Sequence, residues 1–530
     1  MAKHLVVFEP SGLRISVDES CTILEAARNI GLAIPVECGG KGTCGKCRVI
    51  VEPAVKPNSR DLEHISSADL ERGVRMACEH RVSGSMRVIL PQQQRETKIL
   101  TEGITRQWDT DPNLDGQYGI AIDLGTTTIV AFLLDLSNGT QLAQVASLNP
   151  QTAFGEDVMS RLTYAIREER GSEVLQNRVV SEINRLSAQL IELEGIDSIK
   201  ITRVSIVGNT AMSHLLLGAD VKPLGFAPYT PSIRHSVTKR ASELGLHTGE
   251  SSEIYVAPNI AGFVGGDTVA FILSQQLYSS DSITLGIDIG TNGEIVLSNH
   301  GELFCCSAAA GSAFEGATIH QGMRGQTGAI EHVIIHNRNK QPEIFVIGNV
   351  TPQGLCGSAI VDIVAEMKRV NIIDESGRMF PDNQRVRDDN NTGLSYYIWE
   401  SDNLDPERQI VFTQKDVRQV QLAKAAIQAG VKLLLDEVGL AASDIDKVLL
   451  AGAFGNYINP TSALAIGLLP KVDISKVLPI GNAAGEGAKG LLLSSKSRVH
   501  AEKLIDHIKY IELASHKHFQ EVFLESILLQ

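Results

Sequence analysis

Four cysteines in the first eighty residues have the spacing to bind an iron–sulfur cluster. Cys38, Cys44 and Cys47 lie within ten residues of one another, in the pattern C-x5-C-x2-C, and Cys78 follows about thirty residues later. A [2Fe–2S] cluster takes four cysteine thiolates. Glycines among the first three cysteines let the backbone wrap closely and point N–H groups at the sulfurs. The sequence therefore predicts a [2Fe–2S] cluster on these four ligands.

A structural zinc site is the alternative for the same cysteines. Such sites more often show two C-x2-C pairs. This chain has one such pair, Cys44 and Cys47, and an extra ligand upstream. We therefore favour the cluster.

The elements around these ligands follow the order of a β-grasp ferredoxin. Residues 1–92 resemble [2Fe–2S] ferredoxins of the adrenodoxin type, because the first cysteine gap is five residues and not the plant-type four. We expect an α+β domain there. Its predicted parts are a hairpin of residues 4–8 and 13–17 around Pro10 to Gly12, a helix with a capping box at Thr22 and Glu25 that stops at Gly31, and strands at 48–51 and 86–90.

Length and charge limit the remaining possibilities. A chain of 530 residues is too long for one core and predicts three or four domains. Its net charge of −14 argues against nucleic acid or an anionic membrane as the main partner. The N-terminus lacks the apolar core of a signal peptide, and no apolar run is long enough to span a bilayer, so we expect a cytoplasmic protein.

Residues 93–117 are polar, show little periodicity and are interpreted as a linker. If flexible, such a segment would span about 25–30 Å, enough for the cluster domain to move between partners. Packing against the next domain is the other interpretation, and the sequence does not separate the two.

Two similar hairpins predict a nucleotide site. In each, an apolar strand ends at an aspartate, Asp123 or Asp288, and a turn rich in glycine and threonine leads into a second apolar strand. Such a turn directs N–H groups and hydroxyls at a phosphate, with the aspartate near a bound metal. The residues expected to bind ATP here are Gly125, Thr126, Thr127 and Thr128 in the first copy and Gly290, Thr291, Asn292 and Gly293 in the second.

Neither hairpin is a Walker A motif or a dinucleotide fingerprint. The duplicated hairpin resembles the superfamily of acetate and sugar kinases, heat-shock protein 70 and actin, in which two α/β ribonuclease-H-like lobes hold ATP between them. This resemblance implies lobes at 118–284 and 285–530, bound Mg²⁺, and helices near 262–272 and 481–490 that connect the lobes. It also implies catalytic Asp123, Asp288 and Asp267, and an adenosine site at Gly452, Ala453, Gly455 and Asn456.

Several other segments allow two interpretations each. Residues 149–161 could contact a substrate or partner, or simply begin a capped helix. His214 is better explained as an interior histidine than as a ligand. Residues 314–324 could form a site loop, or a structural turn with a solvated Arg324. A long core helix is expected to begin at Thr413 and end at Gly439, and the tail, 519–529, could belong to the core or to a dimer contact.

The chain as a whole resembles the ATP-dependent reductive activators of corrinoid proteins. The motifs that carry this likeness are 208–210, 314–316 with 322–324, and 452–455. The resemblance implies reduction of inactive Co(II) to Co(I) in the corrinoid protein of a methyltransferase system, with electrons from a low-potential donor entering through the cluster. The resemblance does not decide whether the protein forms a homodimer. Some relatives carry an extra middle domain that this chain is expected to lack.

Two other functions remain as alternatives. A similar kinase-like fold activates 2-hydroxyacyl-CoA dehydratases, but there a [4Fe–4S] cluster bridges two subunits, and the N-terminal cysteines of this chain argue against it. The other alternative is a redox sensor in which ATP and cluster state gate binding to a partner.

Overall fold

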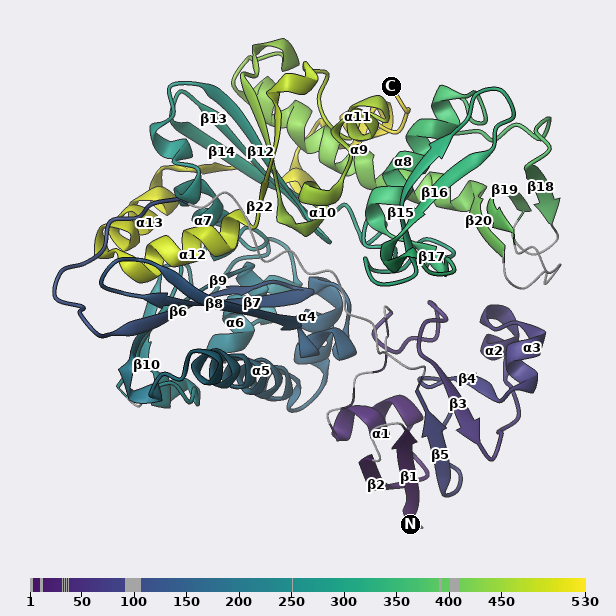
Figure 1. The fold of residues 1–530 in the computed structure, drawn as a ribbon, viewed down its shortest axis with the longest axis horizontal. Helices are drawn as coiled ribbons and strands as arrows, with labels where there is room; N and C mark the ends of the chain where they lie inside the picture. Colours follow the sequence, from purple (N-terminus) through teal and green to yellow (C-terminus); the bar gives the residue numbers. More distant parts are fainter. Residues whose placement is uncertain are drawn as a thin grey trace.

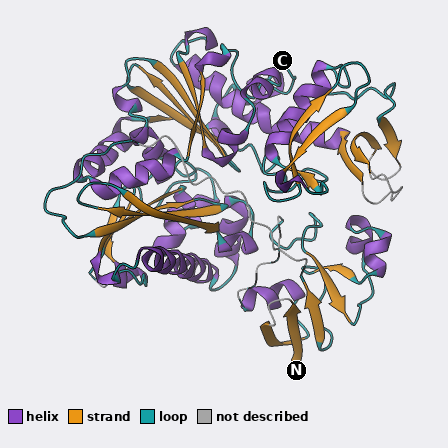
Figure 2. Cartoon of the chain, viewed as in Figure 1, coloured by secondary structure: helices purple, strands orange, loops and turns teal. Residues whose placement is uncertain are grey.

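The computed structural model describes residues 3–530 except 10–12, 31, 33, 35, 37, 91–105, 250, 390–392 and 401–408. A small N-terminal domain lies beside two larger lobes (Figure 1), and both lobes contain helices as well as strands (Figure 2). Within the described ranges, no helix is both long and apolar enough to cross a bilayer.

The N-terminal domain is a five-stranded sheet covered by one helix, with strand order β2-β1-β5-β3-β4. Its β1–β2 hairpin is antiparallel and β1 runs parallel to β5, which confirms the β-grasp prediction. The capping box is also confirmed, because Thr22 Oγ1 accepts from Glu25 N at 3.1 Å. The predicted turn at 10–12 and the stop at Gly31 lie outside the described residues. The elements are β1 (Lys3–Glu9), β2 (Leu13–Asp18), α1 (Ile23–Asn29), β3 (Arg48–Glu52), α2 (Ser59–His64), α3 (Ser67–Glu71), β4 (Val74–Met76) and β5 (Met86–Ile89).

The first lobe contains a six-stranded mixed sheet, β10-β11-β9-β6-β7-β8. Strands β6, β7 and β8 form an antiparallel meander, and β9 then pairs parallel to β6. The strands are β6 (Tyr118–Leu124), β7 (Thr128–Asp135), β8 (Gln141–Leu148), β9 (Ile201–Gly208), β10 (Val237–Arg240) and β11 (Glu253–Val256).

The second lobe repeats this pattern in the sheet β22-β21-β12-β13-β14-β23. Strands β12, β13 and β14 again form a meander, and β21 runs parallel to β12 as β9 does to β6. This repetition confirms the predicted pair of ribonuclease-H-like lobes. The strands are β12 (Ile283–Ile289), β13 (Gly293–Asn299), β14 (Glu302–Ala308), β21 (Lys447–Ala451), β22 (Val477–Gly481) and β23 (Lys509–Tyr510).

Two predicted connecting helices, α7 (Gly266–Ser274) and α12 (Ala483–Leu493), lie between the two sheets (Figure 1). Together with α13 (Ser495–His507) they form an apolar layer that contacts both sheets. The two helices cross closely, since a Cβ at Gly487 would lie 2.1 Å from the Ala270 carbonyl oxygen. The outer face of the first sheet is covered by α4 (Val158–Arg167), α5 (Gly171–Glu194) and α6 (Thr210–Leu217).

The outer face of the second sheet carries the long helix α9 (Gln414–Glu437). Its predicted capping box is confirmed, with Thr413 Oγ1 accepting from Asp416 N at 3.0 Å. The tail helix α14 (Phe519–Glu525) packs against α9 through Phe519 and Phe523, which supports the core interpretation of the tail. Helices α8 (Gly357–Arg369), α10 (Gly452–Tyr457) and α11 (Pro460–Ala465) complete this lobe.

Along the chain, the residues between β14 and α9 form two small three-stranded sheets. The sequence patterns did not predict these sheets. Their strand orders are β16-β15-β17 and β18-β19-β20. Helix α8 packs on the first of them. The strands are β15 (Ala329–Ile335), β16 (Pro342–Val346), β17 (Gly354–Leu355), β18 (Val386–Asp389), β19 (Gly393–Glu400) and β20 (Gln409–Thr413).

The described part of the predicted linker, 106–117, is packed against the lobes. Trp108 Nε1 donates to Glu486 Oε1 at 2.9 Å, and Asp111 forms a salt bridge of 2.8 Å with Arg203. For these residues the packed interpretation holds. The rest of the predicted linker, up to residue 105, lies outside the described residues.

Candidate cluster and nucleotide sites

The four predicted cluster cysteines lie together as two pairs. The Sγ atoms of Cys38 and Cys44 are 3.4 Å apart, and those of Cys47 and Cys78 are 3.3 Å apart. Two sulfurs on one tetrahedral metal, with bonds of about 2.3 Å, lie about 3.8 Å apart. Each pair can thus hold one metal ion. Across the described residues no three Cys, His, Asp or Glu side chains gather closely enough for one ion. The pairs fit a two-iron cluster with two thiolates on each iron.

Glycine is required in the loop that carries three of these cysteines. Gly39, Gly40, Gly42 and Gly45 all have positive φ angles, between +64° and +96°. A Cβ at Gly42 would also lie 2.1 Å from Glu79 Oε1. This backbone aims N–H groups at sulfur. The pKa of the Cys38 thiol is lowered chiefly by its hydrogen bond with Cys44, and further by the N–H groups of Thr43 and Gly40.

The two predicted phosphate turns line one cavity of about 350 Å³ between the lobes. Residues 125–127 join β6 to β7, and residues 290–292 join β12 to β13. This volume is within the usual range for small-molecule sites. Gly293 is not part of the lining, because a Cβ there would lie 2.9 Å from Ile427 Cγ1 and the residue packs against α9. The other predicted turn residues line the cavity: Gly125, Thr126, Thr127, Thr128, Gly290, Thr291 and Asn292.

Asp123, Asp267 and Asp288 come from three separate elements and meet at this cavity. Burial raises the pKa of Asp123 and Asp288 to about 7 and that of Asp267 to about 6. The charge of Asp267 raises the first two further. A divalent cation would relieve this repulsion. Because no three of the described acidic side chains gather closely enough to bind one ion together, one or two of these carboxylates would hold it, with water completing its coordination.

The sequence reasoning missed two residues of this group. Glu294 pairs with Asp288 across the β12–β13 hairpin, and its pKa is raised by burial and by Asp267 and Asp288. Asn482 begins α12, where its Oδ1 accepts from Gly485 N at 2.6 Å, and its side chain also hydrogen-bonds Asp123. The sequence contains a signal for each of these two residues. Glu294 follows the second phosphate turn directly, and Asn482 stands at the start of a predicted connecting helix.

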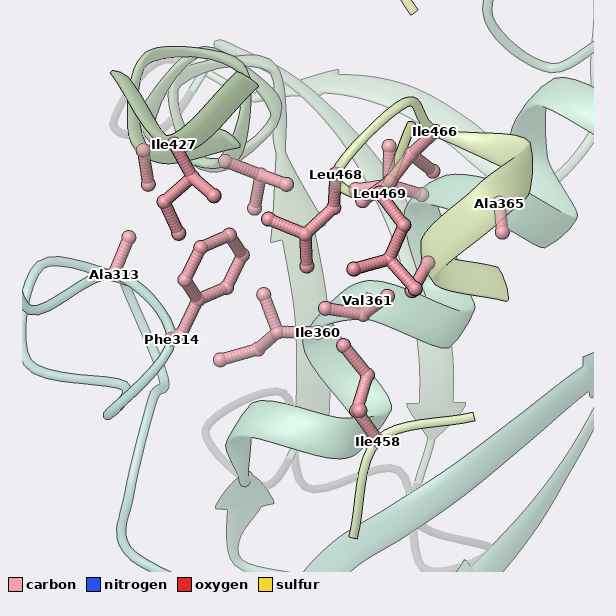
Figure 3. Close-up of a cluster of buried hydrophobic side chains, with 14 of the residues drawn as sticks. Ala313, Phe314, Ile360, Val361, Ala365, Ile427, Ile458, Ile466, Leu468 and Leu469 are labelled. Atoms are coloured by element: carbon pink, nitrogen blue, oxygen red, sulfur yellow. The ribbon is translucent and has the colours of Figure 1, made fainter. Parts of the chain in front are cut away.

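Glu315 lies between the two phosphate turns. Its Oε1 accepts hydrogen bonds from Thr127 Oγ1 at 3.3 Å and from Thr291 Oγ1 at 2.9 Å. The preceding residue, Phe314, is buried in the second-lobe core beside Ile360 (Figure 3), which fixes this position of the backbone. Of the two interpretations of residues 314–324, the site loop agrees with this geometry.

The same loop makes an ion pair between the lobes. Arg324 Nη2 lies 2.6 Å from Oε2 of Glu156, which is buried in the first lobe, so this arginine is not simply solvated. Glu156 belongs to the segment 149–161. That segment also begins α4, with Asp157 Oδ1 accepting from Ser160 N at 2.8 Å. It is therefore both a capped helix start and a contact between lobes.

Only part of the late glycine motif reaches the cavity. Gly452 has φ +79°, and a Cβ there would lie 2.3 Å from Asp288 Oδ1. Phe454 also lines the cavity, and its ring stacks on that of Phe314 with centroids 5.0 Å apart. Ala453 lies between them in the first turn of α10. Gly455 and Asn456 are not lining residues, and a Cβ at Gly455 would meet Leu450. Missed lining residues beyond the turns are His332, Ile347, Cys356, Gly357, Ser358 and Tyr457.

His214 is an interior histidine with satisfied ring nitrogens. Its Nδ1 lies 2.7 Å from the Thr210 carbonyl oxygen, and its Nε2 accepts from Ile233 N at 3.0 Å. The residue is fully buried. The interior interpretation is confirmed.

Three family models match the chain in succession. The 2Fe-2S iron-sulfur cluster binding domain matches residues 6–83, the RACo middle region matches 118–280, and the C-terminal domain of RACo, described as the ASKHA domain, matches 282–530. The first of these agrees with the paired cysteine sulfurs. The third agrees with the phosphate turn and the glycine motif of the second lobe.

Similar proteins match over most of the chain. A corrinoid activation enzyme, RamQ, of Eubacterium limosum is 31% identical, with 96% of both chains covered. A [Co(II) methylated amine-specific corrinoid protein] reductase of Methanosarcina barkeri is 26% identical, covering 72% of this chain and 71% of its own. The solved structure of a reductive activator for corrinoid, iron-sulfur protein is 30% identical, with a TM-score of 0.70 over 99% of this chain and 98% of that one.

The middle region of the family model falls on 118–280, the residues of the first lobe. The ferredoxin-type sheet, the duplicated lobes and the similarity over nearly the whole length agree with one another. The chain belongs to the family of reductive activators of corrinoid proteins, in which a 2Fe-2S domain precedes an ASKHA domain.

Proposed function

We propose that this protein is an ATP-dependent reductase that returns an inactive Co(II) corrinoid protein to its Co(I) form. The corrinoid protein would belong to a methyltransferase system, and a low-potential donor would supply the electrons. One observation carries the proposal. A single chain joins two pairs of cysteine sulfurs to a cleft with two matched phosphate turns, and relatives named for corrinoid activation match it end to end.

In the nucleotide site, Asp123 and Asp288 would hold Mg²⁺ against the phosphates of ATP, with Asp267 beside them. Their raised pKa values and mutual repulsion support this role, because a cation would stabilise the ionised forms. The hydroxyls and N–H groups of the two turns would bind the phosphate oxygens, and Gly452 would leave room beside the metal.

Cys38, Cys44, Cys47 and Cys78 would hold a [2Fe–2S] cluster, which transfers one electron at a time, as reduction of Co(II) to Co(I) requires. ATP can assist an uphill transfer if it changes how tightly the protein binds its partner in the two oxidation states. A difference of about 4 kcal/mol in that binding corresponds to about 180 mV for one electron.

The contacts between lobes support a coupling of this kind. Thr127 and Glu156 of the first lobe meet Glu315 and Arg324 of the second at the edge of the cavity. A nucleotide between the lobes would change these contacts and the relative position of the lobes.

The test is the visible spectrum of a Co(II) corrinoid protein mixed with this protein, a strong reductant and Mg-ATP. We expect Co(I) to form only when hydrolysable ATP is present. Equal rate and extent without ATP would refute the coupling. Absence of Co(I) with every cognate corrinoid protein would favour the sensor alternative.

A further inference from the structure

Glu315 is a carboxylate of the nucleotide cavity that stands apart from the aspartate group. The charges that act on Asp123, Asp288 and Glu294 come from members of that same group. Glu315 instead interacts with the charges of Arg324, Glu156 and Arg161. The cavity therefore contains a group of acidic residues suited to a cation and, between the two phosphate turns, the separate carboxylate of Glu315; Glu331 also lines the cavity.

The two hydrogen bonds of Glu315 use donors that a phosphate would also need. A threonine hydroxyl has one proton, so Thr127 and Thr291 cannot donate to Glu315 and to a phosphate oxygen at the same time. In the structure both donate to Glu315 Oε1. A bound phosphate that takes these hydroxyls leaves the carboxylate free beside it.

The position of Glu315 changes little when these bonds break. Phe314 is buried among second-lobe core residues, including Ile360 and Ile427 (Figure 3), and stacks on Phe454. Gly316 is also confined, because a Cβ there would lie 2.7 Å from Met323 N. Burial raises the pKa of Glu315, which makes its carboxylate a stronger base than an exposed glutamate.

We propose that Glu315 is the general base of ATP hydrolysis, and that the phosphate takes over the two threonine hydroxyls that donate to it. A water oxygen attacks the terminal phosphorus and Glu315 accepts the proton of that water. The bond from phosphorus to the bridging oxygen breaks, the electron pair leaves with ADP, and the proton passes from Glu315 to the phosphate product. This assignment rests on the proposed function, since it requires ATP as the substrate.

Glu315→Gln tests the role with little change in shape, because the amide oxygen can still accept from both threonines. We expect the rate of ATP hydrolysis at saturating Mg-ATP to fall about 10²–10⁴-fold, with ATP affinity nearly unchanged. The rate of the wild type should rise with pH through the pKa of the base, and this dependence should disappear in the variant. Glu315→Asp keeps a carboxylate and should retain more activity than Glu315→Gln. Glu302→Gln, at an exposed ion pair in the same lobe, is the matched control.

Three results would overturn the inference. The first is hydrolysis of ATP by Glu315→Gln at the wild-type rate. Glu315→Gln and Glu315→Ala could both lose ATP affinity and thermal stability while the pH dependence persists, which would show a purely structural role. If the wild type neither binds nor hydrolyses ATP, the proposed function fails as well. If the wild type and Glu315→Gln hydrolyse ATP equally well, the role of Glu315 as general base is rejected, whereas the proposed function stands.

Discussion

Nε of Arg28, in helix α1 of the cluster domain, donates a hydrogen bond of 2.8 Å to the carbonyl oxygen of Ala153 in the first lobe. The same guanidinium lies 5.1 Å from the centre of the Phe154 ring. The first-lobe residues that Arg28 contacts, Ala153 and Phe154, lie just before Glu156. Glu156 forms the ion pair with Arg324 of the second lobe at the edge of the nucleotide cavity. One short stretch of the first lobe thus contacts the cluster domain on one side and the second lobe on the other.

Arg28→Ala should weaken the contact between the cluster domain and the first lobe. The variant loses a hydrogen bond and two cation–π contacts, with Phe154 and Tyr164, together worth about 1–3 kcal/mol. We expect faster amide hydrogen exchange in residues 153–167, with no change in the core of the second lobe. Arg14→Ala, on an exposed strand of the same domain, is the control. Unchanged exchange in Arg28→Ala would show that this contact does not hold the domains together.

Cys78→Ala should abolish the cluster. Iron and acid-labile sulfide should each fall from about two per chain to near zero, and the spin-half signal of the reduced protein should disappear, because the Cys47–Cys78 pair loses one of its sulfurs. Cys21 is a half-buried thiol outside the two pairs, so Cys21→Ala should keep the iron and sulfide content and the spin-half signal. Zinc, or about four irons per chain, in reconstituted wild-type protein would contradict the assignment.

Local signals in the sequence predicted local structure well. The capping boxes at Thr22 and Thr413 form as expected, since each needs only residues within one helical turn. The two phosphate turns also lie where the repeated motif indicates, because a hairpin positions its own turn. The order of the motifs, with the family resemblance it carries, predicted a pair of lobes but not the two small three-stranded sheets of the second lobe.

Contacts between distant residues could not be predicted in this way. Glu315 meets Thr127 from 188 positions away, and Arg28 meets Ala153 from 125. No local pattern specifies such a pairing, which depends on how whole sheets and domains pack. Gly455 has the composition of a nucleotide motif, but a Cβ there would lie 3.2 Å from the Leu450 carbonyl carbon, because α10 packs on β21.

Gly452→Ala should damage the metal side of the nucleotide site. The new Cβ would lie 2.3 Å from Asp288 Oδ1, and alanine at φ +79° costs about 1–2 kcal/mol. We expect Mg-ATP turnover to fall at least about tenfold, which corresponds to about 1.4 kcal/mol. Gly439→Ala has a similar φ of +67° and no atom within 4 Å of its Cβ, so it carries the backbone cost without the clash. Equal turnover in the two variants would show that crowding at Asp288 is unimportant.

The aspartate group should make the ligand-free protein less stable as pH rises. The pKa values of Asp123 and Asp288 are raised to about 7 in the folded protein, whereas an unfolded aspartate titrates near its ordinary value of about 3.9. Between these values the folded state binds more protons than the unfolded state, so the free energy of unfolding falls as pH rises from about 4 to about 7.

This dependence can be measured as the midpoint of urea unfolding across that pH range. Asp288→Asn removes one of the titrating groups and should flatten the fall, while Asp281→Asn, at an exposed position, should leave it unchanged. Mg-ATP should restore stability most at the upper end of the range, since the cation binds the ionised carboxylates. A midpoint that rises with pH in the ligand-free protein, or an equal effect of Mg-ATP at all pH values, would contradict the assignment of this group to a metal.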